Sequence, residues 1–139
     1  MRLSIRNQLP GIVVSVTPGE VMATVKVRLD AGQEITAAVT LEAVRELGLA
    51  AGSTVRALVK STEVSLATGP VDGLSIRNRL PGTVTDVTSG GVMARVKVRI
   101  AGAELTSAIT RDAVSELGLS EGSEVVALIK STEVSLSGD

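Results

Sequence analysis

The sequence predicts an all-β protein made of two tandem copies of one small barrel. The main observation is an internal repeat. Residues 4–29 are identical to the residues 71 positions later at 18 of 26 places. Residues 34–66 are identical to the residues 70 positions later at 22 of 33 places. Within each copy, apolar and polar residues alternate with a period of two, which is typical of half-buried strands. The period of the repeat is longer than those of solenoid repeats, and this favours tandem globular domains.

The repeat divides the chain into a first domain at 1–67, a linker at 68–73 and a second domain at 74–139. The linker is rich in turn-forming residues and has no apolar periodicity. The offset changes because the segment 30–33 of the first copy corresponds to 101–103 in the second copy, which is one residue shorter. An insertion or deletion at this one place indicates an exposed loop tip.

The first copy begins with two predicted strands. Leu9-Pro10-Gly11 is interpreted as a bend or bulge, because proline lacks an N–H and glycine tolerates positive φ. The β-branched residues at 12–16 then predict a strand, and residues 21–29 predict a second strand with strict alternation. The residues expected to face the core from this second strand are Val21, Ala23, Val25, Val27 and Leu29.

A third strand is expected at 34–39, followed by a short helix that Thr40 caps and Gly48 ends. Leu41, Val44 and Leu47 are expected to face the core from this helix. A further alternating strand starts at Val55 and is expected to have Lys60-Ser61 at its end, with residues 63–66 continuing as a fifth strand. Three strands, a short helix and two strands favour an OB-type Greek-key barrel with the helix between strands 3 and 4, and an SH3-like barrel is the alternative.

The composition excludes several classes of function. Lys and Arg number 14 against 15 Asp and Glu, and the chain has no aromatic residue, which argues against nucleic-acid binding. Without Cys or His there can be no thiolate or imidazole metal site, no Cys nucleophile and no His general base. The remaining carboxylates are scattered, so we expect no enzyme activity and no catalytic residues.

The expected environment is the cytoplasm, because the start of the chain has no apolar signal core and no stretch is long enough to span a membrane. Each domain is small and lacks both aromatic core residues and disulfides. Domains of this kind gain stability by association, so we expect contacts between domains or an oligomer.

The candidate site combines an opening motif with a closing motif. Ser4, Arg6 and Asn7 lie at the start of the first copy, and Lys60 and Ser61 lie near its end. These side chains supply hydrogen-bond donors and two positive charges, which suit a tetrahedral oxyanion. The alternative is a turn or capping cluster in which the arginine pairs with Glu34 or Glu63. The same residue types recur in the second copy as Ser75, Arg77, Asn78, Lys130 and Ser131.

The helix caps could add further donors. Thr40 and its counterpart Thr110 are predicted N-caps, and a helix N-terminus is also a place where an anion can dock. We therefore include both threonines among the candidate oxyanion-binding residues. No side chain is expected to bind a metal ion directly.

The repeated Ser-x-Arg-Asn-x-Leu-Pro-Gly, Val-x-Ala-x-Val-x-Val and Lys-Ser-Thr-Glu-Val segments resemble the Mop domain. Their tandem arrangement is similar to the di-Mop molbindins. The resemblance implies cytoplasmic binding, storage and homeostasis of molybdate or tungstate, and a homotrimer with oxyanion sites between domains of different subunits. The balanced charge, the lack of aromatic residues and the lack of a membrane-spanning stretch predict no nucleic-acid or membrane partner.

The resemblance also implies roles for the candidate residues. Ser4 and Ser61 would donate hydroxyls or amides, Arg6 and Lys60 would supply charge, and Asn7 would hold its strand as readily as contact the ligand. The second copy would use Ser75, Ser131, Arg77, Lys130 and Asn78 in the same way, with Thr40 and Thr110 as additional donors. The alternative function is an oxyanion-sensing regulatory or interaction module.

Overall fold

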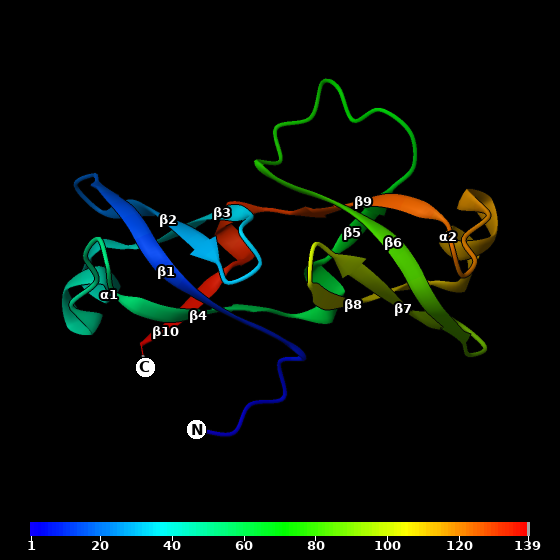
Figure 1. Ribbon diagram of the computed structural model, residues 1–139, viewed down its shortest axis with the longest axis horizontal. Helices are drawn as coiled ribbons and strands as arrows, with labels where there is room; N and C mark the ends of the chain where they lie inside the picture. The colour runs from blue at the N-terminus through cyan, green and yellow to red at the C-terminus, as the bar shows by residue number, and fades with distance from the viewer. Residues whose placement is uncertain (139) are drawn as a thin grey trace.

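The computed structural model describes residues 1–138 and shows two curled five-stranded sheets with one short helix on each (Figure 1). The first repeat contains β1 (Asn7–Pro18), β2 (Met22–Leu29), β3 (Glu34–Thr40), α1 (Leu41–Leu47), β4 (Thr54–Val59), η1 (Ser61–Glu63) and β5 (Ser65–Ala67). The second contains β6 (Asn78–Ser89), β7 (Met93–Ile100), β8 (Ala103–Thr110), α2 (Arg111–Leu117), β9 (Glu124–Ile129), η2 (Ser131–Glu133) and β10 (Ser135–Gly138). The predicted pair of OB-type barrels, each with a helix between its third and fourth strands, is confirmed.

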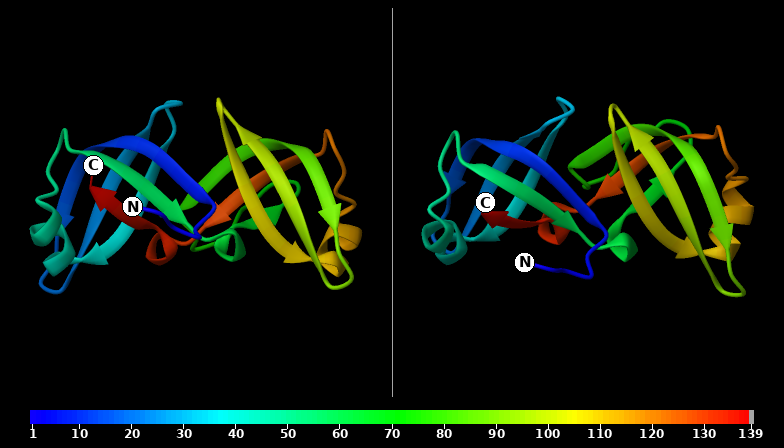
Figure 2. Two further views of the ribbon diagram at one scale, coloured as in Figure 1. Left: turned by 90° about the horizontal axis from the view of Figure 1, so that it is seen from below. Right: turned by 60° about the horizontal axis from the view of Figure 1, so that its bottom comes forward.

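The two repeats exchange their last strands. The sheet orders are β10-β4-β1-β2-β3 and β5-β9-β6-β7-β8, so each sheet contains one strand from the other repeat. Ser65 of β5 pairs with Leu128 of β9, and Ser135 of β10 pairs with Leu58 of β4. In Figure 2 the two sheets lie side by side and the crossing segments run between them. The exchange joins the two halves into one unit.

The strand that contains Val55 ends at Val59, directly before Lys60-Ser61, where the sequence predicts its end. The chain then makes the 3₁₀ turn η1 and turns away toward the other repeat, so the predicted fifth strand begins only at Ser65, as β5 in the other sheet. Hydrogen bonds from Glu63 N to Lys60 O (2.9 Å) and from Val64 N to Ser61 O (3.4 Å) close this turn. Ser61 lies in this turn and Lys60 directly precedes it, so both candidate site residues lie where the chain leaves its own sheet.

The segment Leu9-Pro10-Gly11 lies inside the regular strand β1, so its interpretation as a bend or bulge is wrong. The irregularity in the pairing of β1 with β2 falls between Val13 and Ser15. Gly11 is required for another reason: a Cβ at this position would lie 2.6 Å from the carbonyl oxygen of Arg28 on β2. The close approach of two strand backbones, and not a positive φ, accounts for this glycine.

The core is made by the alternating apolar residues, with two exceptions to the prediction. Val21 is 72% exposed, because β2 begins one residue later, at Met22. Leu47 is 44% exposed, and Leu49 is buried in its place after Gly48 turns the chain with a φ of 61°. The other four predicted core residues of β2 are buried, namely Ala23, Val25, Val27 and Leu29.

The loops at 30–33 and 101–103 are largely exposed, as the position of the deletion predicts. They also meet one another, since a Cβ built on Gly102 would lie 3.5 Å from the Cβ of Ala31. Within residues 1–138, no helix has the length and apolar character needed to cross a membrane.

Candidate anion-binding site

The opening and closing motifs of the first repeat meet at one pocket of about 340 Å³. Its lining consists of Ser4, Ile5, Arg6, Lys60, Ser61 and Thr62. Two of these side chains are cationic, three carry hydroxyls, and none of the described lining residues is a carboxylate. The structure therefore brings together Ser4, Arg6, Lys60 and Ser61, as predicted.

The pairing of β1 with β4 explains why these residues meet. Asn7, the first residue of β1, lies opposite Val59, the last residue of β4. The residue before Asn7 is Arg6 and the residue after Val59 is Lys60, so the two cations lie at the same end of an antiparallel pair. Asn78 lies opposite Ile129 in the second repeat, which places Arg77 and Lys130 in the same relation.

The guanidinium of Arg6 is held against its own segment. Its Nε donates to the carbonyl of Ser4 at 3.1 Å and its Nη2 to the carbonyl of Leu3 at 3.3 Å. Arg77 repeats this geometry, donating to Ser75 at 2.9 Å and to Leu74 at 3.2 Å. These bonds fix the cation at the edge of the pocket before any ligand arrives.

The alternative in which Arg6 pairs with an acidic residue is not what the structure shows. Glu34 forms its ion pair with Arg28, at 3.3 Å. None of the ion pairs found within residues 1–138 includes Arg6 or Lys60. The positive charge at this pocket is therefore not neutralised by a neighbouring carboxylate in the described chain.

The hydroxyl of Ser61 is the most informative group at the site. Its Oγ is buried and has no hydrogen-bond partner within residues 1–138, and the same is true of Ser131 Oγ in the second repeat. A buried hydroxyl without a partner is costly, so its presence at both equivalent positions needs an explanation. An anion that accepts a hydrogen bond from the hydroxyl would remove this cost.

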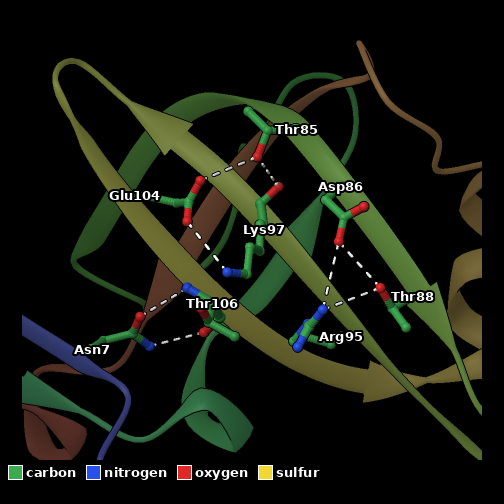
Figure 3. A network of polar contacts seen from close by, with 8 residues as sticks. All are labelled: Asn7, Thr85, Asp86, Thr88, Arg95, Lys97, Glu104 and Thr106. Carbon is green, nitrogen blue, oxygen red and sulfur yellow. Dashed lines mark hydrogen bonds and ion pairs between the residues drawn. The ribbon is translucent and has the colours of Figure 1, made fainter.

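Asn7 and Asn78 hold the two repeats together. The Nδ2 of Asn7 donates to Thr106 O and its Oδ1 accepts from Thr106 N, both at 2.8 Å (Figure 3). Asn78 makes the equivalent pair with Thr36, at 2.9 Å and 2.8 Å. Neither asparagine lines the pocket described above, although each is the next residue after a site arginine.

The two threonine caps lie elsewhere. Thr40 Oγ1 accepts a hydrogen bond from Ala43 N, and Thr110 Oγ1 accepts one from Ala113 N, each at 3.1 Å, which confirms both as N-caps. Thr40 lines a separate hollow whose other residues include Glu20, an acidic neighbour. The structure does not bring Thr40 to the pocket of Arg6 and Lys60.

Three residues in or beside the site are not among those predicted from the sequence, namely Ile5, Thr62 and Ser107. Ile5 and Thr62 lie inside the two repeated motifs, so the repeat itself is a signal for them. Ser107 is fully buried on β8, and its Oγ donates to the carbonyl of Val64 at 2.6 Å. Only the strand exchange places it beside η1, so no local pattern could identify it. Across residues 1–138 no group of three or more His, Cys, Asp or Glu side chains could hold a metal ion.

Comparisons with known proteins show what the whole chain is similar to. A model of the TOBE domain matches residues 3–66 and again residues 74–136. The molybdenum transport protein ModE of Azotobacter vinelandii is 41% identical over 137 residues, covering 98% of this chain and 51% of its own. The molybdenum-pterin-binding protein MopB of Rhodobacter capsulatus is 41% identical over 138 residues, with the same two coverages. The chain thus spans about half the length of the curated relatives it matches.

A solved structure corresponds to the chain over its whole length. The cytoplasmic molybdate-binding protein ModG, in a crystal form with molybdate bound, superposes with a TM-score of 0.97. Its sequence identity is 42%, and the match covers 100% of both chains. The chain belongs to the TOBE domain family and carries two such domains in tandem.

Proposed function

We propose that the protein binds and stores molybdate, or tungstate, as the intact oxyanion. The sites are the pocket of Ser4, Arg6, Lys60 and Ser61 and its counterpart formed by Ser75, Arg77, Lys130 and Ser131. The observation that carries the proposal is the chemistry of the first pocket: two cations and three hydroxyls line it, with no carboxylate among the described lining residues. The unpartnered hydroxyls of Ser61 and Ser131 supply donors that a bound anion would use.

This donor set suits some oxyanions better than others. Molybdate, tungstate and sulfate are fully deprotonated at neutral pH and need only donors, whereas phosphate retains a proton that needs an acceptor. A pocket lined by hydroxyls and cations stabilises a dianion through charge-assisted hydrogen bonds. The size of the closed cage then separates molybdate from sulfate.

Closure of the pocket by a second subunit fits the proposal, and we expect a homotrimer. Apolar side chains at matching positions of the two repeats are exposed in the single chain, with Val21 at 72% and Val92 at 76%. Met22 and Met93 beside them are each 44% exposed. Such side chains are typical of surfaces that become buried on association.

The protein acts by binding, in the cytoplasm, and the domains at 1–67 and 74–139 work as one unit across the linker at 68–73. The full-length likeness to ModG, a molybdate-binding protein, favours this function over an oxyanion-sensing module that passes a signal to a partner. A storage protein binds several anions in each oligomer and needs no protein partner.

Equilibrium dialysis of the purified protein tests the proposal. We expect retained molybdenum, measured by elemental analysis, at one or more atoms per chain when molybdate is in the dialysis buffer. A tenfold excess of sulfate or phosphate is expected to leave this amount nearly unchanged. Molybdenum at the level of a protein-free control, or complete displacement by phosphate, contradicts the proposal.

A further inference from the structure

The two copies of the site differ in how the 3₁₀ turn is held. Ser107, on β8, donates from its hydroxyl to the carbonyl of Val64, which directly follows η1. The bond is short, at 2.6 Å, and both residues are buried. The position equivalent to Ser107 in the first repeat is Ala37 on β3, which has no hydroxyl. The carbonyl of Val134, which follows η2, therefore receives no such bond from this position.

Two adjacent residues of β8 hold both parts of the first site. Thr106 pairs through its backbone with the side chain of Asn7, the residue after Arg6. Ser107 holds Val64, three residues after Ser61. One strand of the second repeat thus fixes both the opening and the closing motif of the first.

The second site is held at only one of these two points. Thr36 pairs with Asn78 as Thr106 pairs with Asn7, so the opening motif is fixed in the same way. At the closing motif Ala37 leaves η2 without the hydroxyl contact. The backbone bonds inside the turn are the same, with Glu133 N to Lys130 O at 2.9 Å and Val134 N to Ser131 O at 3.4 Å. The turns η1 and η2 therefore have the same internal hydrogen bonds, and they differ in whether a hydroxyl from the neighbouring strand holds the residue after the turn.

We propose that Ser107 is a positioning residue that makes the Lys60–Ser61 site the tighter of the two oxyanion sites of this chain. This inference rests on the proposed function. A binding group that is already held in its bound conformation loses less conformational freedom when the ligand arrives, and affinity increases accordingly. One neutral hydrogen bond has a net effect that corresponds to about a fivefold difference in affinity.

The test uses proteins that retain a single site. The pair Lys130→Ala with Ser131→Ala leaves the first site, and the pair Lys60→Ala with Ser61→Ala leaves the second. Isothermal titration calorimetry with sodium molybdate measures the affinity of each single-site protein. A variant with all four substitutions gives the background signal. We expect the first-site protein to bind about fivefold more tightly than the second-site protein.

Two reciprocal substitutions then separate positioning from general stability. Ser107→Ala is expected to weaken the first site about fivefold and to leave the second-site protein unchanged. Ala37→Ser is expected to tighten the second site about fivefold and to leave the first-site protein unchanged. General destabilisation would affect both sites. The melting temperature shows whether Ser107→Ala folds normally. If it does not, the effect of Ala37→Ser on the affinity of the second site alone tests the inference.

The inference and the proposed function can fail separately. If the unmodified protein shows no molybdate uptake above background, the proposed function fails. If the protein binds molybdate but the two single-site proteins have equal affinity, the inference is overturned and the function stands. The same conclusion follows if neither Ser107→Ala nor Ala37→Ser changes the affinity of its own site selectively.

Discussion

The carboxamide of Asn7 pairs with both backbone polar groups of Thr106, through two hydrogen bonds of 2.8 Å that cross from one repeat to the other (Figure 3). The side chain takes the place of a neighbouring strand's backbone, because its oxygen accepts from the N–H of Thr106 and its amide nitrogen donates to the carbonyl of Thr106. Because Asn7 is only 2% exposed, water cannot readily replace these bonds. Asn7 thereby ties the segment that carries Arg6 to β8.

Replacing Asn7 by alanine is expected to destabilise the protein substantially. The change removes both hydrogen bonds and leaves two backbone groups of Thr106 without partners, so we expect a loss of about 2 kcal/mol in the free energy of unfolding. Urea denaturation measures the loss. The neighbouring Gln8→Ala is the control: its single bond, to Ile5 O at 3.1 Å, stays within its own segment. Equal effects of the two substitutions would contradict the assigned role of Asn7.

Gly11→Ala is expected to be disruptive because of the close approach of β2. The added methyl group would lie 2.6 Å from Arg28 O and 2.8 Å from Val27 Cγ1, so the strands must separate. We expect a loss of about 2 kcal/mol in the free energy of unfolding. Gly91→Ala is the matched control, since a Cβ there meets nothing within 4 Å and its counterpart in the first repeat is Glu20. A melting temperature unchanged by Gly11→Ala would refute the packing argument.

Arg79 holds the linker through hydrogen bonds that its counterpart in the first repeat, Gln8, does not make. Its guanidinium donates to the carbonyls of Val71 (2.8 Å), Leu74 (2.6 Å) and Ile76 (3.0 Å), whereas the equivalent Gln8 makes a single bond. Arg79→Gln is expected to increase cleavage within 68–74 by proteinase K several-fold, because the segment loses its tether. Arg95→Gln, which removes an exposed arginine from β7, should leave the cleavage rate unchanged. Equal cleavage of Arg79→Gln and the unmodified protein would show that other contacts hold the linker.

Molybdate affinity is expected to vary little between pH 6 and pH 8. The chain contains no His, the side chain whose charge ordinarily changes in this range, and the anion itself stays deprotonated. Titration calorimetry in buffers of matched ionic strength measures the profile. A tenfold fall in affinity within this range would indicate a titrating group in the site, which is incompatible with a site built from Arg6, Lys60 and hydroxyls.

Much of the fold follows from local sequence patterns. The alternation through Ala23, Val25 and Val27 predicted β2, and Thr40 and Gly48 predicted both ends of α1. The strand exchange could not be predicted. Both repeats close on the same seven residues, Lys-Ser-Thr-Glu-Val-Ser-Leu, so no residue indicates which sheet the last strand joins. Packing between residues far apart in the sequence determines which sheet each last strand joins.

The site was predictable to the same extent. The repeated motifs predicted that Ser4, Arg6, Lys60 and Ser61 lie together, because donor-rich residues at both ends of a domain suggest a shared oxyanion site, and these residues line one pocket. The contacts of Asn7 depend on the exchange between the repeats, so the sequence left its role open. The sequence predicts a bend at Gly11, because the sequence of one strand does not show how closely a second backbone approaches it.

Native mass spectrometry with molybdate tests the central claim most directly. We compare the unmodified protein with a variant carrying Lys60→Ala and Lys130→Ala, and with a control carrying Lys26→Ala and Lys97→Ala, which removes the same charge from strands away from the pocket. A trimer that gains several molybdates and no sulfate, and that loses them only in the first variant, is the predicted result. An assembly that takes up no molybdate, or equal uptake by all three proteins, would contradict the assignment of the oxyanion to this pocket.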